Sequence, residues 1–286
     1  MLARKTTYSI RLMKKKGKKI VMLTSYDAPT AAILSEMGVD MILVGDSVGN
    51  SLLGYESTIP VTLEDVIHHS AAVSRARPDC LIVGDMPFMS YKVSVEQALE
   101  NCGLMLQEGG AEAVKIEGAS KAVVEIVRSV VDAGIPVMGH IGLTPQSIYQ
   151  LGGYRIQGRT ADMAKMLVEQ AVQLEDAGAF SIVIELVPSE TAKLITETVK
   201  IPTIGIGAGP HCDGQVLVLW DMLGLFEDFK PKFVKKYANV RELIKNAVSE
   251  YSKEVREGKF PDEEHSFEMT EEETGRLYGR TKPKDD

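Results

Sequence analysis

Two stretches of the sequence decide the fold, MILVGDSVGN at residues 41–50 and LIVGDMPFMS at residues 81–90. Each is a continuous run of aliphatic residues that ends in Gly-Asp, which places Asp46 and Asp85 at equivalent positions. Continuous apolar runs are typical of strands in a parallel sheet, because such strands are buried on both faces. A single aspartate after such a strand often only caps the next helix. Two in matched positions predict a polar site at the carboxyl ends of the strands.

Similar short apolar runs recur along the chain and alternate with amphipathic segments. We expect eight strands, at residues 20–27, 41–46, 80–85, 113–118, 136–140, 181–188, 202–209 and 215–223. Helices are expected between them, for example from about residue 95 to residue 107. Eight strand–helix units favour an α/β fold of the closed (β/α)8 TIM-barrel type over an open doubly wound sheet.

The length of the chain agrees with one barrel. An α/β barrel alone often takes about 250 residues, and this chain has 286. We therefore expect a single barrel domain over residues 1–286, with an N-terminal helix at residues 7–17 and a C-terminal helical appendage from about residue 239. The appendage begins with NVRELIKNAVSEYSKEVREG and continues as an acidic and polar tail.

The composition indicates which classes of partner and which cellular compartment fit the protein. A net charge of −8 argues against nucleic acid or an anionic membrane as the main partner. No apolar run reaches the roughly 18 to 20 residues that span a bilayer, and the first residues lack the apolar core of a signal peptide. The three cysteines have no metal-like spacing, which indicates a reducing compartment. We expect a cytoplasmic protein.

Polar residues gather at the predicted strand ends, which is where the active site of such a barrel lies. Five successive strands, from the second to the sixth, end in or beside an ionisable residue. These residues, with the serine that follows the first of them, are Asp46, Ser47, Asp85, Lys115, Glu117, His140 and Glu185. Random placement would not produce this clustering, so the sequence predicts one site built from all five strand ends.

Three of these residues are carboxylates, Asp46, Asp85 and Glu117. Only one histidine and no cysteine accompany them, so a hard cation such as Mg²⁺ fits better than zinc. A magnesium site usually keeps few protein ligands and leaves positions for water and substrate. The alternative is that these acids pair with Lys115 or cap helices.

Lys115 and His140 each allow more than one role. Lys115 and Glu117 are two residues apart, so they project from the same face of a strand. Lys115 either neutralises a substrate carboxylate or serves as an ion-pair partner of one of the acids. His140 is a metal ligand, a hydrogen-bond donor to a reacting oxygen, or a satisfied core histidine.

Glu185 is the most informative acid, because it lies within the apolar run SIVIELVP. Burial there would hold the carboxylate close to neutrality, which suits a base that removes a proton from a bound substrate. The alternative is a glutamate paired with a basic residue of a neighbouring loop. Together the residues indicate a metal-dependent barrel enzyme that chelates a small oxygenated anion and removes a proton next to a carbonyl. Several reactions share that description.

A set of longer motifs resembles one family closely. The motifs are, in order, LVGDSVGN, GYESTIPVT, GDMPFMSY, VKIEG, GHIGLTPQS, GGYRIQGR, IELVP and GIGAGPHCDGQVLV. They resemble the ketopantoate hydroxymethyltransferase family from about Thr7 to Phe267. One departure is Trp220, where members often have a histidine before the aspartate. This position lies away from the predicted site.

The resemblance implies a barrel of the phosphoenolpyruvate/pyruvate superfamily that assembles as a homodecamer. Asp46 and Asp85 match the acids that bind Mg²⁺, and Glu117 matches a third acid of the metal site. The metal chelates 3-methyl-2-oxobutanoate through its keto oxygen and carboxylate. Ser47 and Lys115 match residues that hold this carboxylate.

The resemblance also implies the reaction. His140 matches a residue near the bound ketoacid, and Glu185 matches the proposed general base. Glu185 would remove the C3 proton, and the Mg²⁺-stabilised enolate would attack the one-carbon unit of the co-substrate 5,10-methylenetetrahydrofolate. The product, 2-dehydropantoate, belongs to pantothenate and coenzyme A biosynthesis. The partners would thus be a ketoacid, a folate and further copies of the chain.

Two alternatives to this transferase remain open. One is a carbon–carbon or carbon–phosphorus lyase of the same superfamily, although the Lys-Lys-Cys-Gly-His loop of isocitrate lyase is absent from the sequence. The other is a non-catalytic barrel that serves as a scaffold. Loss of Asp46, Asp85 or Glu185 would favour a scaffold, and all three are present.

Overall fold

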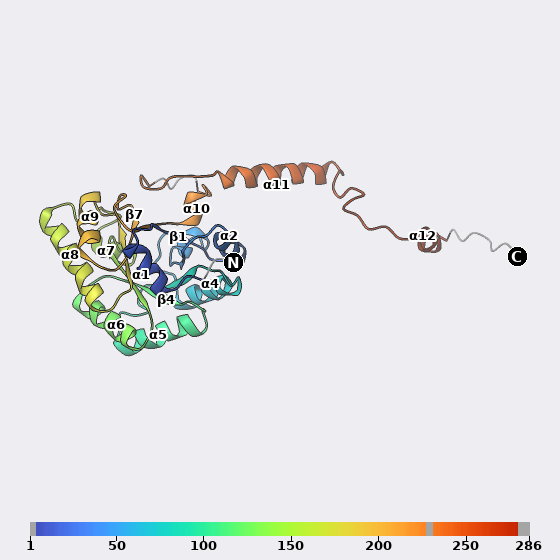
Figure 1. The fold of residues 1–286 in the computed structure, drawn as a ribbon. Coiled ribbons are helices and arrows are strands. Elements are labelled where there is room, and N and C mark those ends of the chain that lie inside the picture. The colour runs from blue at the N-terminus through green and yellow to red at the C-terminus, as the bar shows by residue number, and fades with distance from the viewer. Residues whose placement is uncertain (1–3, 227–230, 280–286) are drawn as a thin grey trace. The chain divides into compact units, whose positions relative to one another are not determined.

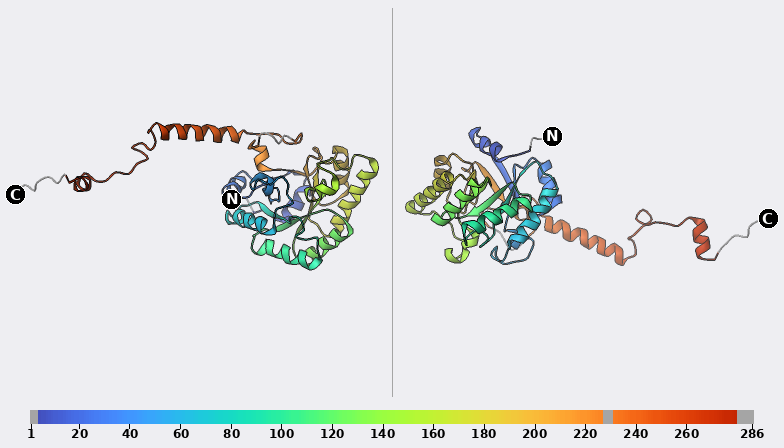
Figure 2. Two further views of the ribbon diagram at one scale, coloured as in Figure 1. Left: turned by 180° about the vertical axis from the view of Figure 1, so that it is seen from behind. Right: turned by 90° about the horizontal axis from the view of Figure 1, so that it is seen from below.

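The computed structural model describes residues 4–226 and 231–279. The chain divides into two units, Met1–Tyr237 and Ala238–Asp286. In the first unit, eight parallel strands form a closed barrel in sequence order, and β8 pairs with β1. Helices surround the strands in every view (Figures 1 and 2). The predicted (β/α)8 barrel is therefore confirmed.

The eight strands begin at or near the predicted residues. They are β1 (Ile20–Thr24), β2 (Met41–Val44), β3 (Leu81–Asp85), β4 (Ala113–Glu117), β5 (Val137–Gly142), β6 (Ser181–Glu185), β7 (Thr203–Ile206) and β8 (Gly214–Leu217). The prediction of strand for all of residues 215–223 is wrong, because Leu219–Met222 forms the short helix α10. The Thr24 hydroxyl accepts a hydrogen bond from the Leu219 N–H at 3.0 Å, which ties the start of this helix to β1.

The helices of this unit follow the expected pattern, with additional short ones in the loops. They are α1 (Thr7–Lys15), α2 (Ala28–Glu36), α3 (Val48–Ser51), α4 (Leu63–Arg75), α5 (Val95–Gln107), α6 (Lys121–Asp132), the 3-10 helix η1 (Pro145–Ser147), α7 (Ile148–Leu151), α8 (Ala161–Asp176), α9 (Ser189–Thr198) and α10. Helix α4 begins where its capping sequence predicts. The Thr62 hydroxyl accepts from the Asp65 N–H at 3.1 Å, and the Asp65 carboxylate accepts from the Thr62 N–H at 3.0 Å.

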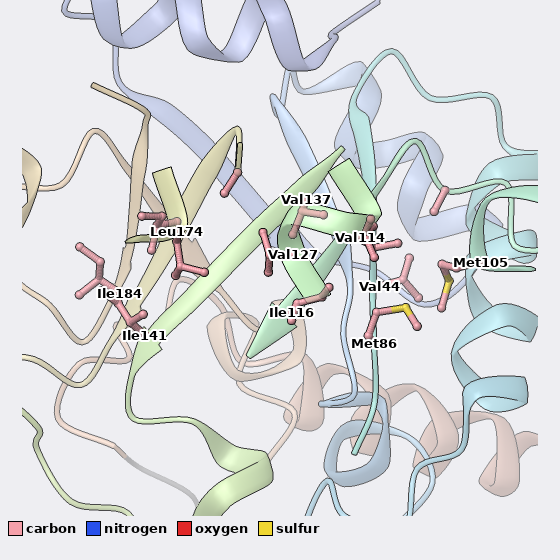
Figure 3. Close-up of a cluster of buried hydrophobic side chains, with 14 of the residues drawn as sticks. Val44, Met86, Met105, Val114, Ile116, Val127, Val137, Ile141, Leu174 and Ile184 are labelled. Atoms are coloured by element: carbon pink, nitrogen blue, oxygen red, sulfur yellow. The ribbon is translucent and has the colours of Figure 1, made fainter. Parts of the chain in front are cut away.

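The core has two parts because alternate residues of each strand face opposite ways. On β4, Val114 and Ile116 face outward and pack in the layer between strands and helices. Figure 3 shows this layer, with Val127 of α6 and Leu174 of α8 among the labelled side chains. Ala113, Lys115 and Glu117 share the opposite face of β4, which therefore points into the barrel.

A separate apolar cluster fills the amino-terminal part of the barrel interior. It contains Met22, Met41, Leu81, Met138 and Ile204, with further strand residues. Ile10 of α1 belongs to the same cluster and is fully buried, so α1 closes this end of the barrel. In the described residues, the interior is therefore filled by apolar side chains at the amino-terminal end.

The second unit contains α11 (Val240–Arg256) and α12 (Glu271–Leu277). Helix α11 matches the helix predicted for the appendage, whereas α12 falls in the segment predicted as a polar tail. Neither helix has a buried residue. That the appendage and the barrel form a single domain stays a prediction. Of the helices in the described residues, none has the length and apolar character that crossing a bilayer requires.

Candidate active site

The register of the sheet brings the predicted site residues into line. Asp85 on β3 is paired with Lys115 on β4, Glu117 with His140 on β5, and Gly142 with Glu185 on β6. The side chains of these paired residues lie side by side on neighbouring strands at the barrel mouth. There they line a cavity of about 110 Å³. All seven predicted residues border it: Asp46, Ser47, Asp85, Lys115, Glu117, His140 and Glu185.

The ammonium group of Lys115 lies at the centre of the charged side chains. Its Nζ atom is 2.8 Å from Asp85 Oδ1, 3.5 Å from Glu117 Oε1 and 3.3 Å from His140 Nδ1. Burial favours the neutral amine, but the charges of Asp85, Glu117 and Asp46 outweigh it and hold the pKa of Lys115 above its usual value. Lys115 is therefore a buried cation at the cavity wall, in contact with acids on its own and the neighbouring strand.

The three carboxylates differ in how fully the protein compensates their charge. Burial, followed by the charges of Asp85 and Glu117, raises the pKa of Asp46 well above its usual value. Burial is also the largest cause of the raised pKa of Asp85, although Lys115 acts in the opposite direction. For Glu117, Lys115 and His140 outweigh the effect of burial and lower the pKa to about 2. Glu117 is thus held in its ionised form by Lys115 and His140, whereas burial favours the neutral forms of Asp46 and Asp85 unless a further cation binds.

The donor set fits a cation held by two carboxylates and not by a closed protein cage. The backbone N–H of Asp46 donates to Asp85 Oδ2 at 3.1 Å, so the two acids lie next to each other. Asp85 Oδ1 faces Lys115 but has no hydrogen bond of good geometry in the described residues. Within residues 4–226 and 231–279, no three His, Cys, Asp or Glu side chains are arranged to hold a metal ion. Two acids with water and substrate oxygens are an arrangement that Mg²⁺ accepts.

Glu117 is engaged elsewhere in this arrangement. His140 Nδ1 lies 3.4 Å from Glu117 Oε1, and the backbone N–H of Gln146 donates to Glu117 Oε2 at 3.2 Å. With Lys115, these contacts occupy both carboxylate oxygens. The ion-pair interpretation therefore accounts for Glu117 directly, and its place as a third metal-site acid stays a prediction.

His140 joins the cation–acid cluster to Glu185. His140 Nε2 lies 3.2 Å from Glu185 Oε2. Burial and Lys115 act to lower the pKa of His140, but Glu117 and Glu185 outweigh them and raise it to about 9. The imidazole is thus a cation at neutral pH and lies beside the Glu185 carboxylate. The Glu185 side chain keeps 15% of its surface exposed, so the full burial expected from its apolar neighbours is not found.

Gly142 allows Glu185 its position at the end of β6. This glycine has a φ of +92° and is paired with Glu185 across the sheet. A Cβ atom at residue 142 would overlap the carbonyl oxygen of Glu185. A left-handed conformation and a close backbone approach both require glycine here. The GHIG sequence of β5 is therefore part of what positions the acid.

Sequence reasoning missed Gln146, which links several strand ends. Its side-chain amide donates to Asp46 Oδ2 at 3.0 Å and to the Met86 carbonyl at 2.9 Å. Its amide oxygen lies 3.1 Å from the Tyr91 hydroxyl, which also hydrogen-bonds the backbone of Glu117. Gln146 is only 2% exposed. With its bonding capacity used, this amide fixes the orientation of Asp46.

Tyr26 is a second residue that the sequence did not single out. Its hydroxyl lies 2.9 Å from the Ser47 hydroxyl, and its side chain is 1% exposed. Tyr26 lies two residues after the end of β1, so a search of all strand ends for polar groups of any charge would have found it. Gln146 lies in the loop after β5 and would have needed knowledge of how that loop folds back.

Several solved structures share the barrel fold of this chain. Phosphonopyruvate hydrolase in complex with oxalate and Mg²⁺ superposes with a TM-score of 0.59 over 96% of this chain and 95% of its own, at 11% identity. A 2,3-dimethylmalate lyase, described as a member of the PEP mutase/isocitrate lyase superfamily, gives a TM-score of 0.59 over 96% and 94%, at 17% identity. Identities this low establish the shared barrel fold alone.

Sequence comparison identifies the family to which the chain belongs, which the shared fold alone does not. The profile of the family described as ketopantoate hydroxymethyltransferase matches residues 4–263. The 3-methyl-2-oxobutanoate hydroxymethyltransferase of Thermoanaerobacter sp. (strain X514) is 55% identical over 268 residues, which cover 94% of this chain and 97% of that protein. The protein of that name from Syntrophomonas wolfei is 53% identical over 277 residues, covering 97% and 100%. The chain therefore belongs to the ketopantoate hydroxymethyltransferase family.

Proposed function

We propose that the protein transfers a hydroxymethyl group from 5,10-methylenetetrahydrofolate to 3-methyl-2-oxobutanoate. The product would be 2-dehydropantoate, a precursor of pantothenate and coenzyme A. The observation that carries the proposal is one small cavity bordered by two adjacent aspartates, a buried cation and the His140–Glu185 pair. The names of the relatives, 3-methyl-2-oxobutanoate hydroxymethyltransferase, supply the substrate.

Asp46 and Asp85 would hold Mg²⁺, because the two acids lie next to each other and Asp85 Oδ1 has no hydrogen bond of good geometry in the described residues. Bound there, the ion would supply Lewis acidity toward the keto oxygen of the substrate. Lys115 and Ser47 would bind the substrate carboxylate. The cavity volume of about 110 Å³ corresponds to the space of about four water molecules, which suits a compact ketoacid.

The apolar part of the cavity wall would receive the branched end of the ketoacid. Leu43, Val183 and Val216 line this part, and each is buried. Aliphatic side chains here exclude water from the reacting carbon and provide no polar partner for a hydroxylated substrate. The same cavity thus combines a charged end for the carboxylate with an apolar end for the alkyl group.

Glu185 would remove the C3 proton. His140, as a cation beside Glu185 Oε2, would hold the carboxylate at the cavity, where it can accept the proton. The carbanion formed at C3 would form a bond to the one-carbon unit of the folate, and water would then replace the folate nitrogen on that carbon, supplying the hydroxyl group and releasing tetrahydrofolate. Glu185 sits at the end of its strand with part of its surface exposed, so the proton taken up can return to solvent.

The assembly and location of the enzyme extend the same proposal. Resemblance to the family supports a homodecamer, and the absence of a membrane-crossing helix in the described residues agrees with a cytoplasmic location. Lyase chemistry of the wider superfamily is the alternative reaction. The solved structures that share the fold include a 2,3-dimethylmalate lyase, but at 17% identity.

The experiment is a product analysis by proton NMR in deuterium oxide, with 3-methyl-2-oxobutanoate, with or without Mg²⁺ and with or without 5,10-methylenetetrahydrofolate. We expect exchange of the C3 hydrogen only when Mg²⁺ is present, and 2-dehydropantoate only when the folate is present as well. Cleavage of a carbon–carbon bond without the folate would replace the proposal with a lyase. If neither hydrogen exchange nor any product were detected under any of the conditions, a non-catalytic scaffold would be favoured.

A further inference from the structure

Three hydroxyl side chains line the cavity, and only two of them have partners in the described residues. The Thr24 hydroxyl accepts from the Leu219 N–H at 3.0 Å, and the Ser47 hydroxyl lies 2.9 Å from the Tyr26 hydroxyl. The third, Thr58, is 5% exposed. Its Oγ1 atom is buried and has no hydrogen-bond partner within residues 4–226 and 231–279.

A buried hydroxyl without a partner destabilises the folded protein, so a native structure needs a reason to keep one. Thr58 belongs to the loop between α3 and α4, and its backbone carbonyl accepts from the Val61 N–H at 3.1 Å. The turn is therefore closed by a backbone hydrogen bond that does not involve the side chain. A valine would fill the same volume without the unsatisfied oxygen. The hydroxyl is thus not explained by folding, and its place on the cavity wall indicates a partner that arrives with a ligand.

We propose that Thr58 is a substrate-binding residue whose hydroxyl donates a hydrogen bond to an oxygen of the bound 2-oxo acid. The inference rests on the proposed function, which supplies the ligand. The acids Asp46, Asp85 and Glu117 are acceptors or candidate metal ligands, so a substrate carboxylate needs donors from the rest of the wall. Lys115 is one such donor, and the free hydroxyl of Thr58 is another.

The test is calorimetric titration of 3-methyl-2-oxobutanoate into the full-length protein with saturating Mg²⁺. Thr58→Val removes the hydroxyl and keeps the shape, and we expect its Kd to rise roughly ten- to a hundredfold, as for loss of one hydrogen bond to a charged group. Thr58→Ser keeps the hydroxyl and should bind within about threefold of wild type. Without ligand, Thr58→Val should be at least as stable as wild type in urea, because it no longer buries an unsatisfied oxygen.

Ser70→Ala is the matched control. The Ser70 hydroxyl is also buried without a partner in the part of the chain that the structure describes, but Ser70 lies on α4 and does not line the cavity. Its removal should leave the Kd unchanged. A purely structural role of Thr58 would show as a loss of stability in Thr58→Val with unaltered Kd, and would overturn the inference.

Other outcomes separate this inference from the proposed function. If the wild type binds the ketoacid and Thr58→Val binds it equally well, Thr58 is not a binding residue and the proposed function stands. If the wild type binds no ketoacid with Mg²⁺ present, the proposed function itself fails. Should Thr58→Val not fold, the affinities of Thr58→Ala and Thr58→Ser replace it, and equal affinity of these two variants would contradict the inference.

Discussion

The two ends of the barrel interior differ sharply although the same strands build both. Toward the amino-terminal end the interior is apolar, with Met41, Met138 and Ile204 packed beneath Ile10 of α1. At the carboxyl end it holds six ionisable side chains around a small cavity: Asp46, Asp85, Lys115, Glu117, His140 and Glu185. On β4, the inward-facing side chain is apolar at Ala113 and charged at Lys115, two residues later.

This difference shows how the barrel separates stability from chemistry. Apolar layers gain free energy from burial and need only shape complementarity. Buried charges are costly on their own and are tolerated when each has a partner. The amino-terminal end should therefore accept conservative apolar changes, whereas the carboxyl end should respond strongly to the loss of a single partner.

Removal of the central cation should have the largest effect. Lys115→Met leaves Asp85 buried without its countercharge and leaves Glu117 with His140 alone. We expect the free energy of unfolding at neutral pH to fall by about 3–5 kcal/mol, measured by urea denaturation. Met138 is paired with Lys115 in the sheet register and lies in the apolar part. As the control, Met138→Leu should lower the free energy of unfolding by less than about 1.5 kcal/mol. If both variants lost equal stability, the proposed difference between the two ends would be contradicted.

Loss of the Gln146 amide should weaken Mg²⁺ binding more than it destabilises the fold. Gln146→Leu removes the donor to Asp46 Oδ2 and leaves that carboxylate free to rotate. We expect Mg²⁺ to bind about 10- to 100-fold more weakly, as for other residues that orient metal ligands. Gln150→Leu, an exposed glutamine of the following helix, is the control and should bind as wild type. Unaltered Mg²⁺ affinity in Gln146→Leu would show that Asp46 needs no support.

The stability contribution of Asp221, which does not line the cavity, should depend on pH. Burial raises its pKa to about 6, although Lys236 acts in the opposite direction. The folded state then holds the proton more tightly than the unfolded state, whose pKa is 3.8. This contribution to stability is complete below pH 3.8 and is lost as the pH rises through about 6.

Because Asp221 is only partly buried, the loss should amount to about 1.5 kcal/mol after allowance for solvent screening. The measurement is the free energy of unfolding between pH 3.5 and pH 7 for wild type and Asp221→Asn. The difference between the two proteins should change across this range by about that amount, in the direction of relative stabilisation of the variant at high pH. A constant difference would show that Asp221 titrates normally.

The smallest effect is expected at the apolar end. Ile204→Val removes one methylene from a fully buried site, which should cost about 0.5–1.5 kcal/mol. Ketoacid affinity should not change, because Ile204 does not line the cavity. The affinity is measured by calorimetry beside urea denaturation. A large loss of affinity would mean that the two ends are coupled through the packing of the interior.

The apolar runs carried enough information for the architecture. Their number and alternation predicted the closed barrel, which the structure confirms. Boundaries at the carboxyl ends were less predictable, because strand and cap residues are contiguous. β1 stops at Thr24, since Asp27 already caps α2 by accepting from the Thr30 N–H at 2.8 Å. β6 stops before Leu186, whose φ of +47° leaves the strand conformation.

The charged residues of the site could be predicted from the sequence, whereas the residues that loops bring to the site could not. Asp85, Lys115 and Glu185 could be assigned to one place because strand ends meet there. Gln146 could not, since its contact with Asp46 joins residues 100 positions apart through a loop of unpredictable path. The partner of each charge also required the structure, which shows Glu117 engaged by Lys115 and His140.

The most direct test of the central claim is C3 hydrogen exchange of 3-methyl-2-oxobutanoate in deuterium oxide with Mg²⁺, comparing wild type with Glu185→Gln. If the carboxyl end is a magnesium and ketoacid site with Glu185 as base, the variant should exchange about a hundredfold or more slowly. Mg²⁺ and ketoacid should still bind within a few-fold of wild type by calorimetry. Exchange at the wild-type rate in Glu185→Gln would contradict the account.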